Sequence, residues 1–474
     1  MVEDLDLYTG TLQYRGIEFT FAFDKVELRL IPPKEKRHLI EHEWKWKAIG
    51  HGAYVPADPI PVDTGYLVGN CNETTHKIVF IPKLGSYLSL YNAVVRIELR
   101  AYVICRLDRA SIDRASFSCP EINYIHPVNQ AISLILDPSN FNEKGVATLS
   151  TQEFDVTTTE TQQFAVDGKE VHSFFGITRK VSTKIHEPPL SLKSALIFDF
   201  ASTDDYAFVL RLWQIARNFI RFLCYRKNIF ISQVELSCPA KEGKHESFAT
   251  MFLLNQDGDI ESDTLQKGRY IKQIRIAGHE GQILSDIALG NLYLRHLPEN
   301  SQTGRRIDAS RFVMITAAFE WEFRKLYPSG IRRSDATISA EKYVSETLKE
   351  QISNTSGKKK EILKRLSKQV ESDSLKSEII QVCKDYSSIF GCFGEHLFHL
   401  NDLELNYNEM GERLSSQRNN FAHGNLDKEF IGVSALDLIL LEFVVYTLQL
   451  KSYGIVDTEI QRSINELFCR RLAL

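Results

Sequence analysis

Two side chains near the C-terminus, Arg418 and His423, have the properties needed to break a phosphate ester bond without a metal. Histidine titrates close to neutral pH, so it can accept or donate a proton. Arginine stays charged and cannot act as a base, but it can bind a phosphate and stabilise negative charge that develops on it. The same spacing recurs at Arg37 and His42, so spacing alone identifies no site.

The surroundings of Arg418 and His423 distinguish them from the other pair. Arg418 follows an amphipathic run that ends at Leu414, and an almost wholly apolar segment, 436–450, comes after His423. Apolar spacing of this kind predicts two helices of a bundle, with the pair on the turn between them. The structural alternative is that both side chains only bind carbonyl groups of the loop.

Other polar residues extend this candidate site. Asn419 directly follows the arginine and would orient the site or the phosphate, and Asn420 is a weaker candidate for binding the substrate. Gly424 leaves space beside the histidine because it has no side chain. Glu320 and Glu322 lie on an earlier predicted helix, from which either could support Arg418 or simply be a solvated or structural acid.

Arg418, Asn419 and His423 resemble the signature of the HEPN superfamily, in which an arginine, a polar residue and a nearby histidine lie between two bundle helices. The wider layout is similar to that of ApeA-type anti-phage proteins. The resemblance implies a metal-independent endoribonuclease that acts in anti-phage defence by abortive infection. It also implies host tRNA as the substrate, cut in the anticodon loop, and a homodimer with the site at its interface.

The chemistry of RNA agrees with a dimeric site. RNA carries its own nucleophile, the 2′-hydroxyl, beside each phosphate. Cleavage needs one group to remove that proton and another to protonate the leaving 5′-oxygen, and one histidine cannot readily do both in one step. Two copies of His423 and Arg418, one from each subunit of a dimer, would supply both the group that removes the proton and the group that donates one. The products would carry 2′,3′-cyclic phosphate and 5′-hydroxyl ends. We expect no cofactor and no metal.

Two alternative functions stay open. The helical region could be a non-catalytic dimerisation or binding module, or a toxin controlled by a separate antitoxin.

Two further motifs lie outside this site. The basic run at Lys358, Lys359 and Lys360 could contact phosphates or be a solvated helix face. His38, Glu41 and His42 fit an inverted zinc-peptidase pattern, but the alternating segment 43–47 predicts a strand there, which does not give the ligand geometry of a helix.

The elements that position these residues form a multidomain α+β chain. Residues 1–190 show period-two alternation interrupted by turn residues, which predicts a β-rich, sandwich-like domain with a sensor or regulatory role. Residues 191–300 predict an α+β section, with strands over 229–297. Residues 301–474 predict an all-α bundle, and the resemblance implies that it is of HEPN type. We expect the nuclease to be restrained, because a constantly active nuclease would poison its host. No residue of the sequence identifies what releases it, and our hypothesis is a phage protein.

Composition limits the possible partners. The chain has 474 residues and a net charge of −4, whereas proteins that coat duplex nucleic acid are usually basic overall. No CxxC pair occurs among the eight cysteines, which predicts no zinc ribbon or redox motif, and in a reducing cytoplasm we expect them to be free thiols. The acidic start has no apolar signal region, and no long uncharged apolar stretch is evident. We therefore expect a cytoplasmic protein with no membrane partner.

Overall fold

The structure is a computed structural model of the chain. It describes residues 5–473 except 52, 73–76, 108–110, 137–146, 152–157, 242–243, 255, 257–268, 372 and 423–431. By packing, the chain divides into two compact units. The first comprises Met1–Arg221, Asn228–Ile260 and Glu280–Leu289, and the second comprises Phe222–Lys227, Glu261–His279 and Gly290–Leu474. The division into three domains at 190 and 300 stays a prediction.

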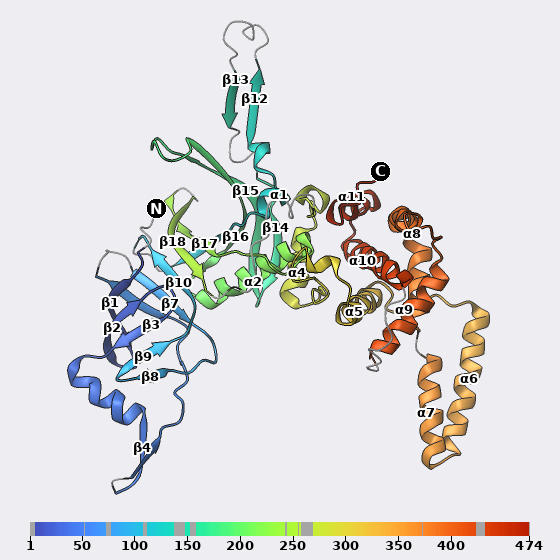
Figure 1. The fold of residues 1–474 in the computed structure, drawn as a ribbon, viewed down its shortest axis with the longest axis horizontal. Coiled ribbons are helices and arrows are strands. Elements are labelled where there is room, and N and C mark those ends of the chain that lie inside the picture. Colours follow the sequence, from blue (N-terminus) through green and yellow to red (C-terminus); the bar gives the residue numbers. More distant parts are fainter. Residues whose placement is uncertain are drawn as a thin grey trace. The chain divides into compact units, whose positions relative to one another are not determined.

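The first unit is built on a large antiparallel sheet, which confirms the β-rich N-terminal region. In the described residues the strand order is β14-β15-β16-β11-β17-β18-β10-β7-β6-β1-β2-β3-β9-β8 (Figure 1). The bounds are β1 (Tyr8–Tyr14), β2 (Ile17–Phe23), β3 (Leu28–Ile31), β6 (Leu67–Cys71), β7 (Lys77–Pro82), β8 (Ser89–Tyr91), β9 (Val94–Ile97), β10 (Leu99–Cys105), β11 (Ile112–Phe117), β14 (Gln162–Val166), β15 (Lys169–Val181), β16 (Leu190–Thr203), β17 (Gln233–Pro239) and β18 (His245–Leu253).

Smaller elements accompany the sheet. Two separate hairpins pair β4 (Trp46–Gly50) with β5 (Ala53–Pro56) and β12 (Ile132–Leu136) with β13 (Ala147–Thr151). The helices are α1 (Ile122–Ile125), α2 (Tyr206–Cys224) and α4 (Glu280–Leu289). The carboxylate of Asp205 accepts hydrogen bonds from the backbone N–H groups of Ala207 and Phe208, so it caps α2. The prediction of strands across 229–297 is wrong at α4.

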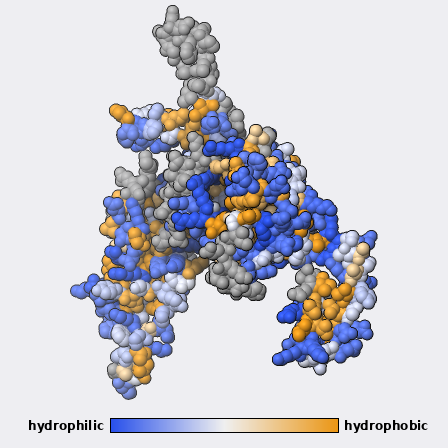
Figure 2. Space-filling view, turned by 45° about the vertical axis from the view of Figure 1, so that its right-hand side comes forward, coloured by the Kyte–Doolittle hydropathy of each residue, from blue (hydrophilic) through white to orange (hydrophobic). Residues whose placement is uncertain are grey.

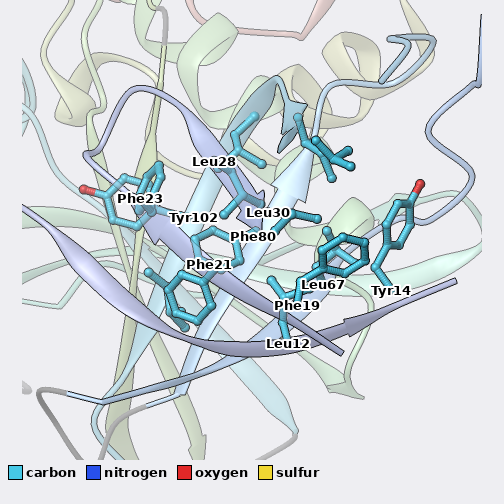
Figure 3. Close-up of a cluster of buried hydrophobic side chains, with 14 of the residues drawn as sticks. Leu12, Tyr14, Phe19, Phe21, Phe23, Leu28, Leu30, Leu67, Phe80 and Tyr102 are labelled. Carbon is cyan, nitrogen blue, oxygen red and sulfur yellow. The ribbon is translucent and has the colours of Figure 1, made fainter. Parts of the chain in front are cut away.

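Period-two alternation explains the aromatic core of the sheet. Every second residue of β2 is buried, and these residues are Ile17, Phe19, Phe21 and Phe23. Phe21 packs edge to face on Phe80 with ring centroids 5.2 Å apart, and Phe23 packs in the same way on Tyr102 at 4.8 Å (Figure 3). Aromatic pairs of this kind contribute beyond the area they bury.

The C-terminal half is mostly helical, as predicted. Its helices are α5 (Ala309–Leu326), α6 (Asp335–Ser353), α7 (Gly357–Glu371), α8 (Leu375–His399), α9 (Tyr407–Ala422), α10 (Gly432–Ser452) and α11 (Asp457–Leu467). α10 packs against α5, α8, α9 and α11, so it is the central helix of the bundle (Figure 1).

α10 is the one helix in the described residues that is long and apolar enough to cross a membrane, with a mean hydropathy of 1.7. In the structure 78% of its apolar window is buried. A core helix of a bundle meets the same criteria, so this helix is weak evidence for a membrane span.

The polar stretch after α5 forms a helical hairpin, because α6 and α7 pack mainly against each other. Ser334 caps α6 by accepting a hydrogen bond from the backbone N–H of Thr337. α6 contains no buried residue, which explains why apolar periodicity did not reveal it. Figure 2 shows a band of apolar side chains on this hairpin, bordered by polar ones; its exposed apolar residues include Ile338, Val344, Ile362 and Leu366.

Candidate active site

Arg418 lies within the last two turns of α9 and not on a turn between helices, so that prediction is wrong. The helix continues because no glycine or proline occurs between Glu412 and His423. Its apolar face is buried at Met410, Leu414 and Phe421. Phe421 packs edge to face on Phe312 of α5, with ring centroids 5.5 Å apart, so the end of α9 is held beside α5.

The guanidinium of Arg418 is bound by an acid of α5. Its Nη2 donates to Oε1 of Glu320 at 3.2 Å and to Oε2 at 3.4 Å. The Arg418 side chain is 38% exposed and that of Glu320 is 19% exposed, so the ion pair lies at the surface of the bundle. Arg324, one turn further along α5, places Nη2 4.0 Å from Glu320. An anion could therefore reach both arginines.

The structure distinguishes the two acids of α5. Glu322 is fully buried and faces the bundle interior, where Lys325 Nζ lies 3.7 Å away and Gln449 Nε2 donates at 3.4 Å. These partners place Glu322 on a different face of α5 from Glu320. Of the two candidates, Glu320 is the residue that supports Arg418.

A third acid, Glu378 of α8, belongs to this cluster and was not predicted from the sequence. Burial, together with the negative charge of Glu320, raises the pKa of Glu378 to about 7, while Arg324 and Arg418 act in the opposite direction. One of its carboxylate oxygens is buried and has no hydrogen-bond partner among the described residues. Glu378 exchanges a proton near neutral pH, as a general acid or base must.

A signal for Glu378 is present in the sequence. It occupies the same helical face as Leu375, Ile379 and Val382, all of which are buried. An acid on the core-facing stripe of an amphipathic helix is a candidate for a shifted pKa.

A second arginine fixes the rotation of α9. Arg413 donates from Nε to Oδ2 of Asp437 at 2.7 Å and from Nη2 to Oδ1 at 2.9 Å. Asp437 lies in α10 and is fully buried. Since Arg413 is directed toward α10, Arg418, five residues later, is directed toward α5.

The structure describes some of the remaining predicted site residues and not others. Asn419 is exposed and Asn420 half-buried, both beside Arg418 on α9. His423 lies outside the described residues, so its prediction has no structural test. Lys358 and Lys359 are exposed and Lys360 is half-buried, all at the start of α7. Within the described part of the chain α7 packs mainly against α6, and no hydrogen bond or ion pair joins these lysines to Arg418.

The zinc-peptidase pattern at His38, Glu41 and His42 was set aside because a strand was predicted there, and that prediction is wrong. Residues Leu39–Trp44 form a helical turn, not a strand, and the rings of His38 and His42 lie side by side with centroids 4.6 Å apart. Among the residues the structure describes, however, no group of three or more His, Cys, Asp or Glu side chains could hold a metal ion.

The cluster at Arg418 combines a cation that can bind phosphate, a carboxylate that orients it and an acid that titrates near neutrality. Comparison of the chain with models of protein families, with curated proteins and with solved structures found no match. The resemblance to HEPN proteins therefore depends on residues 418–423 and on the layout of the chain.

Proposed function

We propose that this protein is a metal-independent endoribonuclease of HEPN type. The observation that carries the proposal is the ion pair of Arg418 with Glu320, which lies on the surface at the end of α9, just before His423 in the sequence. A surface arginine oriented by a carboxylate can bind a phosphate without reorganising.

In the proposed reaction the 2′-hydroxyl oxygen attacks the adjacent phosphorus and the bond from phosphorus to the 5′-oxygen breaks. His423 removes the 2′ proton, and His423 of a second copy protonates the leaving oxygen. Arg418 stabilises the charge on the phosphorane, and Glu320 is a positioning residue that orients Arg418. Glu378, whose pKa is about 7, is an additional proton donor or acceptor within the cluster.

The biological setting follows from the resemblance. We propose host tRNA, cut in its anticodon loop, as the substrate, and growth arrest during phage infection as the result. The β-rich unit would sense a phage protein and release the nuclease in the cytoplasm. An exposed loop is a suitable target because attack in line with the leaving oxygen needs a flexible backbone.

The test is cleavage of total RNA by the full-length protein, with mapping of the product ends. We expect cyclic-phosphate and 5′-hydroxyl ends, cleavage that persists in EDTA, and loss of cleavage in Arg418→Ala and His423→Ala. His399→Ala is the matched control, because His399 is an exposed histidine of α8 outside the cluster. Undiminished cleavage by His423→Ala, or its loss in EDTA, would refute the mechanism and favour a non-catalytic binding module.

A further inference from the structure

The helical unit contains a cavity of about 420 Å³ that none of the residues of the Arg418 cluster lines. It is bounded by the first turn of α5, the middle of α10, the end of α11 with the residues that follow it, and the segment 298–307. Its volume lies within the range of about 300–1,000 Å³ that is typical of sites for small molecules. The cavity is therefore large enough for a ligand of its own.

The lining of this cavity is strongly cationic. Four arginines from separate segments contribute to it, and these are Arg269, Arg305, Arg311 and Arg470. Among the described residues of the lining, the one carboxylate is that of Glu442, and it already has partners. Arg311 donates to Glu442 from Nη2 at 2.5 Å, and the hydroxyl of Tyr225 donates to the same oxygen. Glu442 thus neutralises Arg311 within the lining.

The other three arginines keep their charge available. In the described part of the chain, Arg269, Arg305 and Arg470 have no carboxylate within 4.0 Å. Arg305 is exposed, whereas Arg470 is half-buried and lies 5.3 Å above the ring of Phe443. Burial lowers the pKa of Arg470, which means that its cation is incompletely solvated. Three guanidinium groups around one cavity, none with a carboxylate partner among the described residues, favour an anionic ligand with several oxygen acceptors.

The cavity also has an aromatic wall. Phe468 packs against Tyr225 with ring centroids 4.9 Å apart and against Phe443 at 4.8 Å. All three rings line the cavity. Aromatic side chains bind flat rings by stacking, and stacking of a nucleic-acid base contributes about 1–3 kcal/mol.

We propose that this cavity binds a free nucleotide, with the phosphate on Arg269, Arg305 and Arg470 and the base against the aromatic wall. Inorganic phosphate would contact only the arginines, and a nucleoside would contact only the aromatic rings. A 5′-phosphorylated RNA end offers the same chemistry as a free nucleotide, so the experiment compares the two sources.

The proposed site shares two helices with the Arg418 cluster. Arg311 precedes Glu320 on α5 by nine residues, about 14 Å along the helix axis. Glu442 follows Asp437 on α10, and Asp437 fixes α9 through Arg413. A nucleotide in the cavity would stabilise the start of α5 and the middle of α10, the two helices that position Arg418.

The experiment is calorimetric titration of the full-length protein with adenosine 5′-monophosphate, adenosine, inorganic phosphate and a 5′-phosphorylated trinucleotide. We expect the monophosphate to bind at least tenfold more tightly than each of the other three probes. It should also raise the melting temperature, because ligands that bind only the folded state stabilise it. Neither readout uses RNA cleavage, so failure here is distinguishable from failure of the nuclease proposal.

Arg305→Gln and Arg470→Gln should each weaken binding of the monophosphate at least tenfold. Arg306→Gln is the matched control, because Arg306 is the exposed neighbour of Arg305 and does not line the cavity. Arg305 is exposed, so its variant should fold even if the half-buried Arg470 variant does not. Absence of saturable binding by adenosine, guanosine, cytidine and uridine monophosphates would overturn the proposal. Tighter binding of the trinucleotide, or equal binding by Arg305→Gln and wild type, would also overturn it.

Discussion

The guanidinium of Arg413 forms two hydrogen bonds with the fully buried carboxylate of Asp437. Burial raises the pKa of Asp437, and the charge of Arg413 opposes that rise. The pair ties α9 to α10 and determines which way the rest of α9 faces. The geometry of the candidate site therefore depends on an ion pair that is not itself part of the chemistry.

Replacing the buried partner should be costly. We expect Asp437→Asn to lower the free energy of unfolding by about 2–4 kcal/mol, because it removes the buried counter-charge of the partly buried Arg413 and leaves only the exposed Glu409. Glu409 is the second partner of Arg413, and its side chain is 65% exposed, so Glu409→Gln should change stability by less than about 0.5 kcal/mol. Urea denaturation measures both. Equal effects of the two substitutions would show that the Asp437 pair does not hold α9.

Glu320→Gln tests the positioning of Arg418. Stability should change little because the pair is near the surface, but RNA cleavage should fall about tenfold or more as Arg418 loses its orientation. Loss of the Glu320 charge should also lower the pKa of Glu378, since that charge raises it. Glu412→Gln, which removes an exposed ion pair with Lys376, is the control and should leave both quantities unchanged.

Glu378 should make stability depend on pH. Its pKa is raised from 4.5 to about 7 in the folded state, so between these values the folded chain holds a proton that the unfolded chain releases. The free energy of unfolding then falls as the pH rises through this range. Glu378→Gln stays neutral, so near pH 8 it should be more stable than wild type by on the order of 2 kcal/mol, allowing for solvent screening.

Thermal or urea denaturation at about pH 4 and pH 8 checks this. Near pH 4 the glutamic acid is neutral in both states, so the variant and wild type should differ little. A difference of the same size at both values would mean that Glu378 does not titrate in this range.

Arg418→Lys separates charge from geometry. Lysine keeps the positive charge but cannot present two parallel N–H groups to a phosphate, so cleavage should fall at least tenfold while the fold persists. Single-turnover cleavage of RNA, with circular dichroism as the folding check, measures this. Wild-type rates in Arg418→Lys would mean that Arg418 acts only as a diffuse charge. Arg462→Lys, on the exposed face of α11, is the control.

Local patterns in the sequence predicted many of the elements. Alternation over 11–14 and 77–81 is confirmed by β1 and β7, and the apolar run 436–450 by α10. The hairpin of α6 and α7 was not resolved into helices, because helices that bury little apolar surface lack the spacing that identifies an amphipathic helix. The order of strands was not predictable either, since it depends on pairing between distant segments.

Of the residues in the candidate site that the structure describes, only Arg418 could be predicted from the sequence with its role. Arg418 could be chosen from its sequence context, but the choice between Glu320 and Glu322 depends on the rotation of α5 in the bundle. The extension of α9 through Ala422 was missed, because the polar residues after Arg418 were interpreted as a turn. Glu378 lies on the core-facing stripe of α8, but the size of its pKa shift depends on its burial in the bundle and on the charge of Glu320 on another helix, which the sequence of α8 alone does not give.

The pairing of β10 with β18 has a consequence for synthesis on the ribosome. Ala101 lies opposite Leu253 in the sheet, so the central strands cannot be joined until the chain has grown past residue 253. Arg418 is made 165 residues later, roughly 10–30 s at ordinary elongation rates. A nascent chain thus has time to complete the β-rich unit first, and each new molecule acquires its proposed sensor before its proposed nuclease site.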